Sequence, residues 1–528
     1  MADVRGTGPS AATSVAHRPD TNGRVPVELR VGVVGHRWLE DDEAARTAVA
    51  AALEDLWQRR SNRTTSNTPV GLTVVSALAE GADRIAAAAA VGRGARLEVV
   101  LPMPSAEYEK DFATPESLAS YRKLLTDAAS VTALPPGDDR QAAYLEGGMR
   151  VVDRSDALLA IWDGEPARGT GGTAEIVAYA DTTHRPVRWL RVAPAAGVIG
   201  IRERREHPVP DDLGPLSPRA FRALDAYTAQ SVSTAADLAG SPEARFFQPY
   251  FARADRLAGR YQRWLLRSSQ LIYALAVVAV ASVAAQLVFF PEERWPAWIE
   301  VAALAIITVV LFLGRRLRLL RRWLSARQLA ERIRVATMLR AAGMPDPPRW
   351  GPVLDDGDWV ERAVDELWMR APDAPVDRSF AQLQNALVTG WLDPQIAYHD
   401  GAEARAQSRL RVVVPITVGL FVLSLVAAIM HSLDLFVFEG MPAYWSYVSI
   451  IAPTAAAAVS GYVGQREYVR RARRSRQAAD TLRAARSSVD RAADPAQLRA
   501  VLAAIQPVLA AESQDWSTTT TLHDLEVP

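Results

Sequence analysis

The sequence contains no cysteine, so disulfides, thiolate metal sites, iron–sulfur clusters and a cysteine nucleophile are all excluded. Its 7 histidines are scattered along the chain, and none has the spacing of a metal-binding motif such as HExxH. We therefore expect neither a metal ion nor a cofactor. The 60 basic residues equal the 60 acidic residues in number, which argues against a basic surface that binds nucleic acid.

The N-terminal segment also lacks the apolar stretch of a signal peptide. Residues 1–25 are instead rich in Ser, Thr, Pro and Gly, a composition typical of a disordered tail. We expect a second such tail at 511–528. The soluble half of the chain is therefore expected to remain in the cytoplasm.

The second half of the chain carries four long apolar runs, at 271–290, 295–314, 412–430 and 441–464. Each reaches or approaches the roughly 20 residues that a helix needs to cross the hydrocarbon core of a bilayer. A buried core helix is the alternative for any such run. Arginine-rich segments flank both pairs of runs, and this favours two membrane-spanning hairpins.

The turns inside the hairpins, 291–294 and 431–440, carry little positive charge compared with the segments outside them. The positive-inside rule then places both termini and the central loop in the cytoplasm and the two turns outside, with the chain in the cytoplasmic (inner) membrane. No charged residue lies deep in a span; Glu300 is close to the outer interface. A charge-coupled transporter usually carries such groups at mid-membrane, so this class is disfavoured.

Small and polar residues on the fourth span suit either close helix packing or a weakly polar lining, and we favour packing. The Arg-rich segments 327–340 and 470–486 follow the two hairpins at equivalent places, which indicates an internal duplication. Two interpretations of these segments stay open. They either pack on one another as helices or lie along an anionic lipid surface.

In the first half, near-continuous apolar runs alternate with helical patterns, and we expect strands at 27–34, 72–78, 96–101, 131–134, 157–162 and 187–192. Such strands are typical of a parallel sheet covered on both faces. The sequence therefore predicts an α/β doubly wound, Rossmann-like domain, followed by an all-α membrane domain with four transmembrane helices in two hairpins.

Ligands of doubly wound sheets bind outside the carboxyl ends of the strands, so the residues that follow the strands are the candidate site. They are, in chain order, Gly35, His36, Arg37, Ser76, Glu80, Gly81, Asp83, Tyr108, Asp163, Gly164, Gly169, Thr170, Gly171, Gly172, Thr173 and Glu175. Glycine turns at helix N-termini suit a phosphate, Arg37 could add a bidentate contact, and the ring of Tyr108 or Phe112 could stack on a base.

Each of these features also has a purely structural interpretation. A glycine turn can be only a turn, Tyr108 can cover the edge of the core, and His36 can cap the loop after it. The carboxylates of Glu80, Asp83 and Glu175 are favourable in the first turn of a helix whatever the function. The prediction of a nucleotide site depends on all of them meeting at one edge of the sheet.

Several of these segments resemble the SLOG superfamily, a Rossmann-like nucleotide-binding group that contains the LOG and DprA-like domains. The resemblance covers about 27–195 and is carried by Gly35-His36-Arg37, Ala79-Glu80-Gly81-Ala82-Asp83, Tyr108 with Asp111-Phe112, Asp156 with Trp162-Asp163-Gly164, and Gly171-Gly172-Thr173-x-Glu175. More loosely, Ala330-Glu331-Arg332 and the stretch from Trp391 to Tyr398 resemble the two-span SLATT modules.

The resemblance implies a homo-oligomeric membrane effector in bacterial nucleotide signalling or antiviral conflict. Its cytoplasmic domain would bind a nucleotide or a nucleotide-derived second messenger, and its spans would open a pore or disrupt the bilayer. LOG phosphoribohydrolases carry GGxGTxxE, whereas here the segment between Thr173 and Glu175 is one residue shorter. On a helix that change turns a side chain by about 100°. Catalysis therefore stays open, with Glu175 as the only candidate catalytic residue.

Three functions are compatible with the sequence: a ligand-gated membrane effector, a membrane-tethered nucleotide N-glycosidase, and a non-enzymatic membrane scaffold. The expected organisation is a tail at 1–25, a nucleotide-binding domain at 26–200, a linker at 201–252, a first two-helix module at 253–345, a connecting region at 346–404, a second module at 405–510 and a tail at 511–528.

Overall fold

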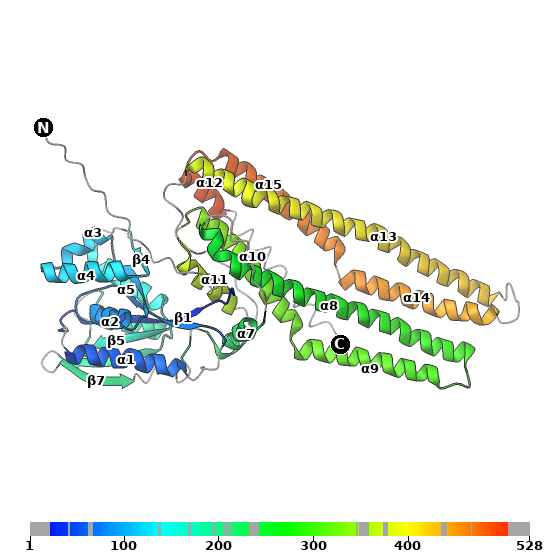
Figure 1. Cartoon of the computed structure of the whole chain (residues 1–528), viewed down its shortest axis with the longest axis horizontal. Coiled ribbons are helices and arrows are strands. Elements are labelled where there is room, and N and C mark those ends of the chain that lie inside the picture. The colour runs from blue at the N-terminus through cyan, green and yellow to red at the C-terminus, as the bar shows by residue number, and fades with distance from the viewer. Residues whose placement is uncertain are drawn as a thin grey trace. The chain divides into compact units, whose positions relative to one another are not determined.

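The computed structural model of the chain divides into two compact units, which we call the head and the helical unit (Figure 1). The head comprises Met1–Ser231 with Asp355–Pro372, and the helical unit comprises Val232–Leu354 with Asp373–Pro528. The structure describes residues 22–40, 43–61, 67–135, 139–166, 171–193, 197–203, 208–210, 213–214, 216–231, 242–344, 347, 358–372, 379–433, 441–465 and 467–504. Gly169 and Thr170 of the candidate site lie outside these described residues.

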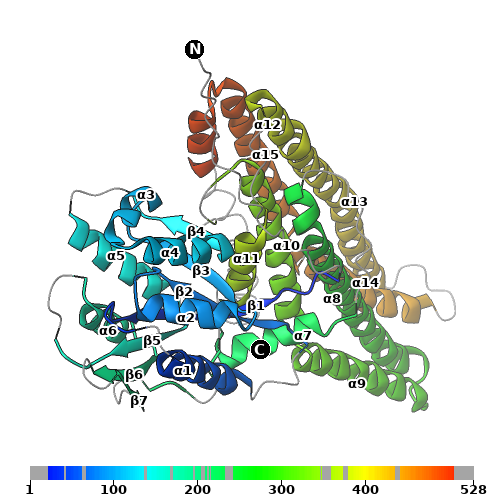
Figure 2. The same ribbon diagram turned by 60° about the vertical axis from the view of Figure 1, so that its left-hand side comes forward.

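The head is built on a 7-stranded sheet with the order β4-β3-β2-β1-β5-β6-β7 (Figure 2). Its strands are β1 (Val27–Gly35), β2 (Val70–Ser76), β3 (Arg96–Leu101), β4 (Ser130–Ala133), β5 (Ala157–Trp162), β6 (Val187–Ala193) and β7 (Gly197–Glu203). Strands β1 to β6 are parallel, which confirms the predicted doubly wound sheet. Edge strand β7 is antiparallel to β6 and was not predicted; its sequence GVIGIRE has two glycines among its β-branched residues, and glycine is depleted in strands.

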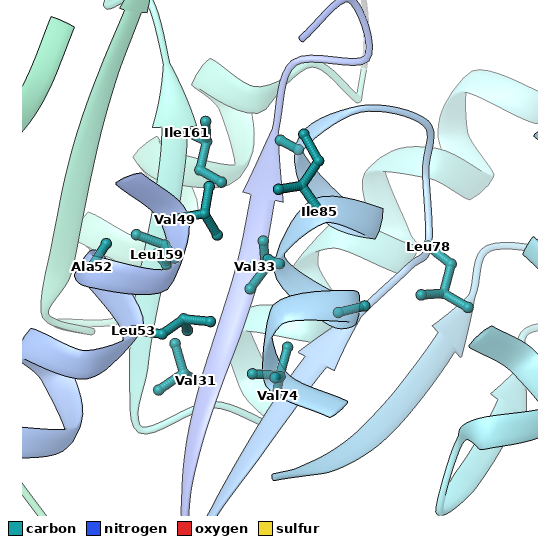
Figure 3. Packing of buried hydrophobic residues seen from close by; sticks show 14 of the residues in the cluster. Val31, Val33, Val49, Ala52, Leu53, Val74, Leu78, Ile85, Leu159 and Ile161 are labelled. Atoms are coloured by element: carbon teal, nitrogen blue, oxygen red, sulfur yellow. The ribbon is translucent and has the colours of Figure 1, made fainter. Parts of the chain in front are cut away.

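Helices cover both faces of this sheet. One face carries α1 (Glu43–Ser61), α2 (Ala82–Val91) and α4 (Pro115–Asp127), and the other carries α5 (Arg140–Asp153) and α6 (Thr173–Thr182). Successive side chains of a strand point to opposite faces, so Val33 joins the core under α1 and α2, whereas Val34 joins the core under α5 and α6. Figure 3 shows the first core, with Val49 of α1 and Ile85 of α2 beside β1.

Short elements complete the head: α3 (Ser105–Tyr108), the 3-10 turn Glu109–Asp111 and α7 (Pro218–Thr228). A further helix, α11 (Asp358–Arg370), comes from the segment between the two hairpins and nevertheless belongs to the head. It packs against α7 and β1. The region 346–404, expected to be a connection, thus contributes a helix to the head.

The helical unit contains two hairpins of similar design. The first consists of α8 (Pro242–Phe289), α9 (Trp295–Arg316) and α10 (Leu319–Ala341), and the second of α13 (Asp393–Ser432), α14 (Met441–Gln465) and α15 (Tyr468–Arg491). Before α13 come α12 (Phe380–Leu387) and a π-helical turn, Val388–Leu392. Among the residues that the structure describes, four helical stretches are long and apolar enough to cross a membrane: Pro242–Phe289, Trp295–Arg316, Phe380–Ser432 and Tyr444–Arg491.

The two hairpins have the same break between the second and third helices. Arg318, with φ of 48°, separates α9 from α10, and Glu467, with φ of 45°, separates α14 from α15. Such left-handed residues are uncommon outside glycine, so their recurrence at equivalent places supports the predicted duplication. The third helix of each hairpin packs mainly on its own first helix, α10 on α8 and α15 on α13. This pairing differs from the interpretation in which the two Arg-rich helices pack on one another.

The two hairpins contact each other through α8 and α14. A Cβ placed on Gly461 of α14 would lie 3.0 Å from the Tyr273 ring of α8. Gln270 of α8 donates a 3.1 Å hydrogen bond from its side-chain amide to the hydroxyl of Tyr462. At this point the small residues of the fourth span serve close packing.

Candidate functional site

The candidate site lies where the strand order reverses, between β1 and β5, the place where doubly wound sheets bind ligands. His36 follows β1 and Asp163 follows β5. The Nε2 atom of His36 lies 3.0 Å from Oδ1 of Asp163 and 3.2 Å from its backbone N. The carboxyl ends of the two strands are therefore joined by side chains from both predicted segments.

Gly35 and Gly81 allow two turns to approach each other closely. A Cβ on Gly35 would lie 2.5 Å from the Ala82 side chain, and a Cβ on Gly81 would lie 2.5 Å from the carbonyl oxygen of His36. Gly81 also has φ of 73°, a conformation that L-residues rarely adopt. The start of α2 can pack against the turn after β1 only because both positions are glycine.

Asp83 stabilises the turn between β2 and α2. The Ser76 hydroxyl donates a 3.1 Å hydrogen bond to Oδ2 of Asp83 and accepts a 3.0 Å bond from the backbone N–H of Leu78. Burial raises the pKa of Asp83 to about 7, against the lowering effect of the Ser76 hydrogen bond and of backbone hydrogen bonds from Ala79 and Ala77. Asp83 and Ser76 thus have a structural role, as the alternative interpretation anticipated for Asp83.

Arg37 lies beside an aromatic and acidic cluster. Its guanidinium carbon is 5.0 Å from the ring centre of Tyr144, and the Tyr144 hydroxyl donates to the Asp111 carboxylate. Tyr108 is buried, and its ring packs edge-on against Phe112 at a centroid distance of 5.1 Å. Tyr108 therefore belongs to the core edge, whereas Arg37 is an exposed cation at the rim of the site.

Glu80 is fixed by a neighbouring helix. Its carboxylate accepts a hydrogen bond from the hydroxyl of Ser117 in the first turn of α4. Arg84 donates from Nη1 to the same hydroxyl at 2.8 Å, and its guanidinium carbon lies 4.2 Å from the ring centre of Phe112. These contacts attach the β2–α2 turn to α4 beside the site.

The glycine-rich turn at the start of α6 is closed by its own glutamate. The backbone N–H of Gly171 donates a 2.5 Å hydrogen bond to Oε2 of Glu175. Gly172 is the last residue before α6, which begins at Thr173. Gly171 has φ of 83°. Since the carboxylate of Glu175 already accepts from the loop, its observed role is that of a first-turn acid.

Asp163 and Gly164 form the turn after β5. Oδ1 of Asp163 accepts a 3.0 Å hydrogen bond from the backbone N–H of Glu165, and Gly164 has φ of 96° beside the ring of Trp189. This turn and the Gly171 turn flank the reversal point of the sheet, and both carry the positive φ that glycine permits.

Three residues of the site were missed in the sequence: Ser117, Arg140 and Tyr144. Arg140 donates from Nη1 to Glu107 at 2.8 Å and also binds Asp111, so it belongs to the same cluster as Arg37. Arg140 and Tyr144 lie on α5, which follows β4. The residues after the fourth predicted strand would have revealed them by the rule applied to the other strands.

Within the described residues, no group of three or more His, Asp or Glu side chains is arranged to hold a metal ion. The side chains at this edge that suit a ligand are the exposed guanidinium of Arg37 and the His36–Asp163 pair, beside the Gly81 and Gly171 turns. Their chemistry suits an anionic group with hydroxyls nearby.

No protein-family model matches the chain, and no curated protein matches it. Among solved structures, DNA processing protein A (DprA) from Streptococcus pneumoniae matches with 18% identity and a TM-score of 0.24, over 34% of this chain and 54% of that protein. The chain thus spans about half the length of that protein, and a likeness of this size carries no information on ligand or activity.

Proposed function

We propose that this chain is a multi-pass membrane effector whose cytoplasmic head binds a nucleotide or nucleotide-derived second messenger and thereby controls the spans. The observation that carries the proposal is the meeting of Arg37, the His36–Asp163 pair and two positive-φ glycine turns at the reversal point of the sheet. A guanidinium beside the N-termini of helices suits a phosphate. The predicted resemblance to SLOG domains agrees with this ligand class.

The first two helices of the helical unit lie in the chain between two parts of the head, Met1–Ser231 and Asp355–Pro372. Parts that fold together must be on one side of a membrane. The chain therefore crosses an even number of times between them, which supports a hairpin in which α8 and α9 both span. Arginines at the end of α9 and in α15, the helix that follows α14, then support a cytoplasmic head in the inner membrane.

The test begins with thermal unfolding of the full-length protein in detergent, with nucleotides, cyclic dinucleotides and ADP-ribose as probes. A probe at a hundred times its Kd should stabilise the head by about 2.7 kcal/mol. Arg37→Ala should abolish this shift. Arg150→Ala is the matched control, because Arg150 is an exposed arginine on α5 with only a 3.8 Å ion pair to Glu146.

A probe that stabilises the protein should then change ion leakage through liposomes that contain it, as a differential affinity for two states requires. Stabilisation without any change in leakage would contradict the effector function and leave a binding scaffold. A shift that survives Arg37→Ala would place the ligand elsewhere. If no nucleotide shifts the unfolding temperature, the proposed ligand class is wrong.

A further inference from the structure

Six arginines lie at the ends of the apolar stretches of the helical unit, and we call them the arginine collar. All six are exposed, and none makes an ion pair among the residues that the structure describes. The members of the collar are Arg267 of α8, Arg315 and Arg316 of α9, Arg409 and Arg411 of α13, and Arg473 of α15.

The collar residues of the first hairpin lie at one level along its helices. Helix α9 runs back along α8 from the turn after Phe289 (Figure 1), and Arg315 is about as far from that turn as Arg267. Gln270, less than one turn after Arg267, donates a 3.1 Å hydrogen bond to the hydroxyl of Tyr462 on α14. This part of the collar is therefore close to the level of Tyr462 on the second hairpin.

The second hairpin carries its part of the collar at the same end of the spans. Val463, the residue after Tyr462, and Leu410 of α13 pack against one apolar cluster that includes Ala472 of α15. The three collar arginines of this hairpin are chain neighbours of these residues, because two of them flank Leu410 and the third follows Ala472. The collar thus surrounds one end of the four apolar stretches.

Arginines that lie further from the apolar stretches are neutralised by the chain itself. Arg483 of α15 binds Asp400 of α13 with 2.6 Å between Nη2 and Oδ1, and Arg486 binds Asp393 with 2.7 Å between Nε and Oδ1. On α10, Glu331 pairs with two arginines of its own helix. Within the described part of the chain, carboxylates therefore serve these arginines and none serves the collar.

In the proposed topology the collar lies at the cytoplasmic boundary between hydrocarbon and water. Trp264, less than one turn before Arg267, is 60% exposed, and tryptophan is enriched at this depth of a membrane. A guanidinium can donate two parallel hydrogen bonds to one phosphate group. The negative surface potential of a leaflet with anionic lipids attracts arginines at this depth. The charge of the collar is therefore complementary to that of an anionic lipid surface.

We propose that the arginine collar binds the headgroups of anionic phospholipids. These lipids supply the counter-charge to six arginines that have no carboxylate partner among the described residues. The occupant is a lipid and not a free phosphate ion, because the collar lies at the ends of the spans, where headgroups are concentrated. The proposal rests on the membrane crossing in the proposed function and is independent of the nucleotide ligand.

The test uses the full-length protein in liposomes of phosphatidylcholine, with and without phosphatidylglycerol. Extraction at alkaline pH first shows whether the chain is inserted in the bilayer. Release of the protein by alkali would contradict the membrane crossing, and with it the proposed function. If the protein stays inserted, the lipid dependence of its unfolding temperature tests the collar alone.

The unfolding temperature of the inserted protein should be several degrees higher with phosphatidylglycerol than without it. The double variants Arg315→Gln with Arg316→Gln and Arg409→Gln with Arg411→Gln should each lose at least about half of this rise. In phosphatidylcholine alone, both double variants should unfold at the temperature of the parent protein, which shows that they fold. An absent rise in the parent, or an undiminished rise in both variants, would overturn the proposal.

Two controls separate charge from packing and the collar from the rest of the chain. Arg315→Lys with Arg316→Lys keeps the charge and should retain most of the rise; equal losses in the lysine and glutamine variants would contradict the proposal. Arg150→Gln with Arg191→Gln removes two exposed arginines of the head and should retain the whole rise. A loss there equal to that in the collar variants would also contradict it.

A last arm distinguishes the lipid headgroup from a free anion. Inorganic phosphate added to liposomes of phosphatidylcholine alone should leave the unfolding temperature of the parent protein unchanged. A rise as large as that with phosphatidylglycerol would show that the collar binds a soluble anion, and would overturn the assignment to lipid.

Discussion

Arg30 and Glu366 form a two-pronged buried ion pair although Glu366 lies 336 positions after Arg30 in the chain. Glu98 shares the same guanidinium, with 3.3 Å between Nε and Oε1. Removing the Arg30 cation leaves Glu98 without this guanidinium and leaves Glu366 with Arg362, at 3.1 Å, and breaking a buried pair in this way costs about 3–5 kcal/mol. We therefore expect Arg30→Met to lower the protection of β1 amides against hydrogen exchange by that free energy.

The double variant Arg30→Met with Glu366→Met should lose less stability than the two single variants lose in sum. The reason is that an apolar pair can replace a buried ion pair at little cost in free energy. Additive losses in this cycle would show that the two side chains do not interact across the interface of α11 and β1.

The pKa of Asp83 predicts a pH dependence of head stability. The pKa is raised in the folded protein to about 7 from an ordinary value of 3.8, so the folded state holds a proton that the unfolded state releases. Stability should therefore fall as pH rises from about 4 to about 7, by at most about 4 kcal/mol. The free energy of unfolding should differ less between pH 5 and pH 8 in the Asp83→Asn variant than in the parent protein. An unchanged difference would assign the pH dependence to other groups.

Gly81 and Gly94 form a matched pair for testing the β1–α2 contact. Both have positive φ, 73° and 75°, so alanine is strained at either position. A Cβ on Gly94 meets nothing within 4 Å, whereas one on Gly81 meets the backbone of His36 and Arg37. Gly94→Ala should lower the free energy of unfolding by about 1 kcal/mol. Gly81→Ala should lower it clearly more and should impair binding of any nucleotide ligand. Equal costs in thermal unfolding would show that the close approach is unimportant.

A similar pair tests the contact between the hairpins. Gly461 packs on Tyr273, whereas a Cβ on Gly464 meets nothing within 4 Å. Gly461→Val should weaken the association of α8 with α14 and lower the unfolding temperature in detergent, and Gly464→Val should have little effect. Equal decreases of the unfolding temperature in the two variants would contradict this prediction.

The orientation of the first hairpin can be tested by cysteine accessibility in intact cells, since the natural chain contributes no thiol. Glu292→Cys, in the turn between α8 and α9, should react with a membrane-impermeant reagent from outside. Glu116→Cys, on α4 of the head, should react only after the cells are lysed. The opposite pattern would invert the proposed topology.

The parallel sheet was predictable because six apolar runs lie where its strands form, and the spans were predictable from length and flanking arginines. The position of α11 was not. Glu366 and Arg362 look like an ordinary solvated helix face, since their partners Arg30 and Asp156 are distant in sequence and leave no local pattern.

That this edge of the sheet binds a ligand stays a prediction. His36 contacts Asp163 across the ends of β1 and β5, whereas Asp83 and Glu175 bind backbone groups of their own turns. A carboxylate in the first turn of a helix fits both roles in sequence, and only the geometry of its acceptor atoms separates them.

The place of α11 in the chain also sets an order of events during synthesis. The ribosome produces β1 to β7 long before Asp358, and the first two apolar helices emerge between them. Before α11 has been synthesised, Asp156 and Glu28 lack their ion-pair partners Arg362 and Arg370. In the proposed topology, the head is complete only after the first hairpin has been made and its far end has returned to the cytoplasm, so that a completed head would report correct insertion of that hairpin.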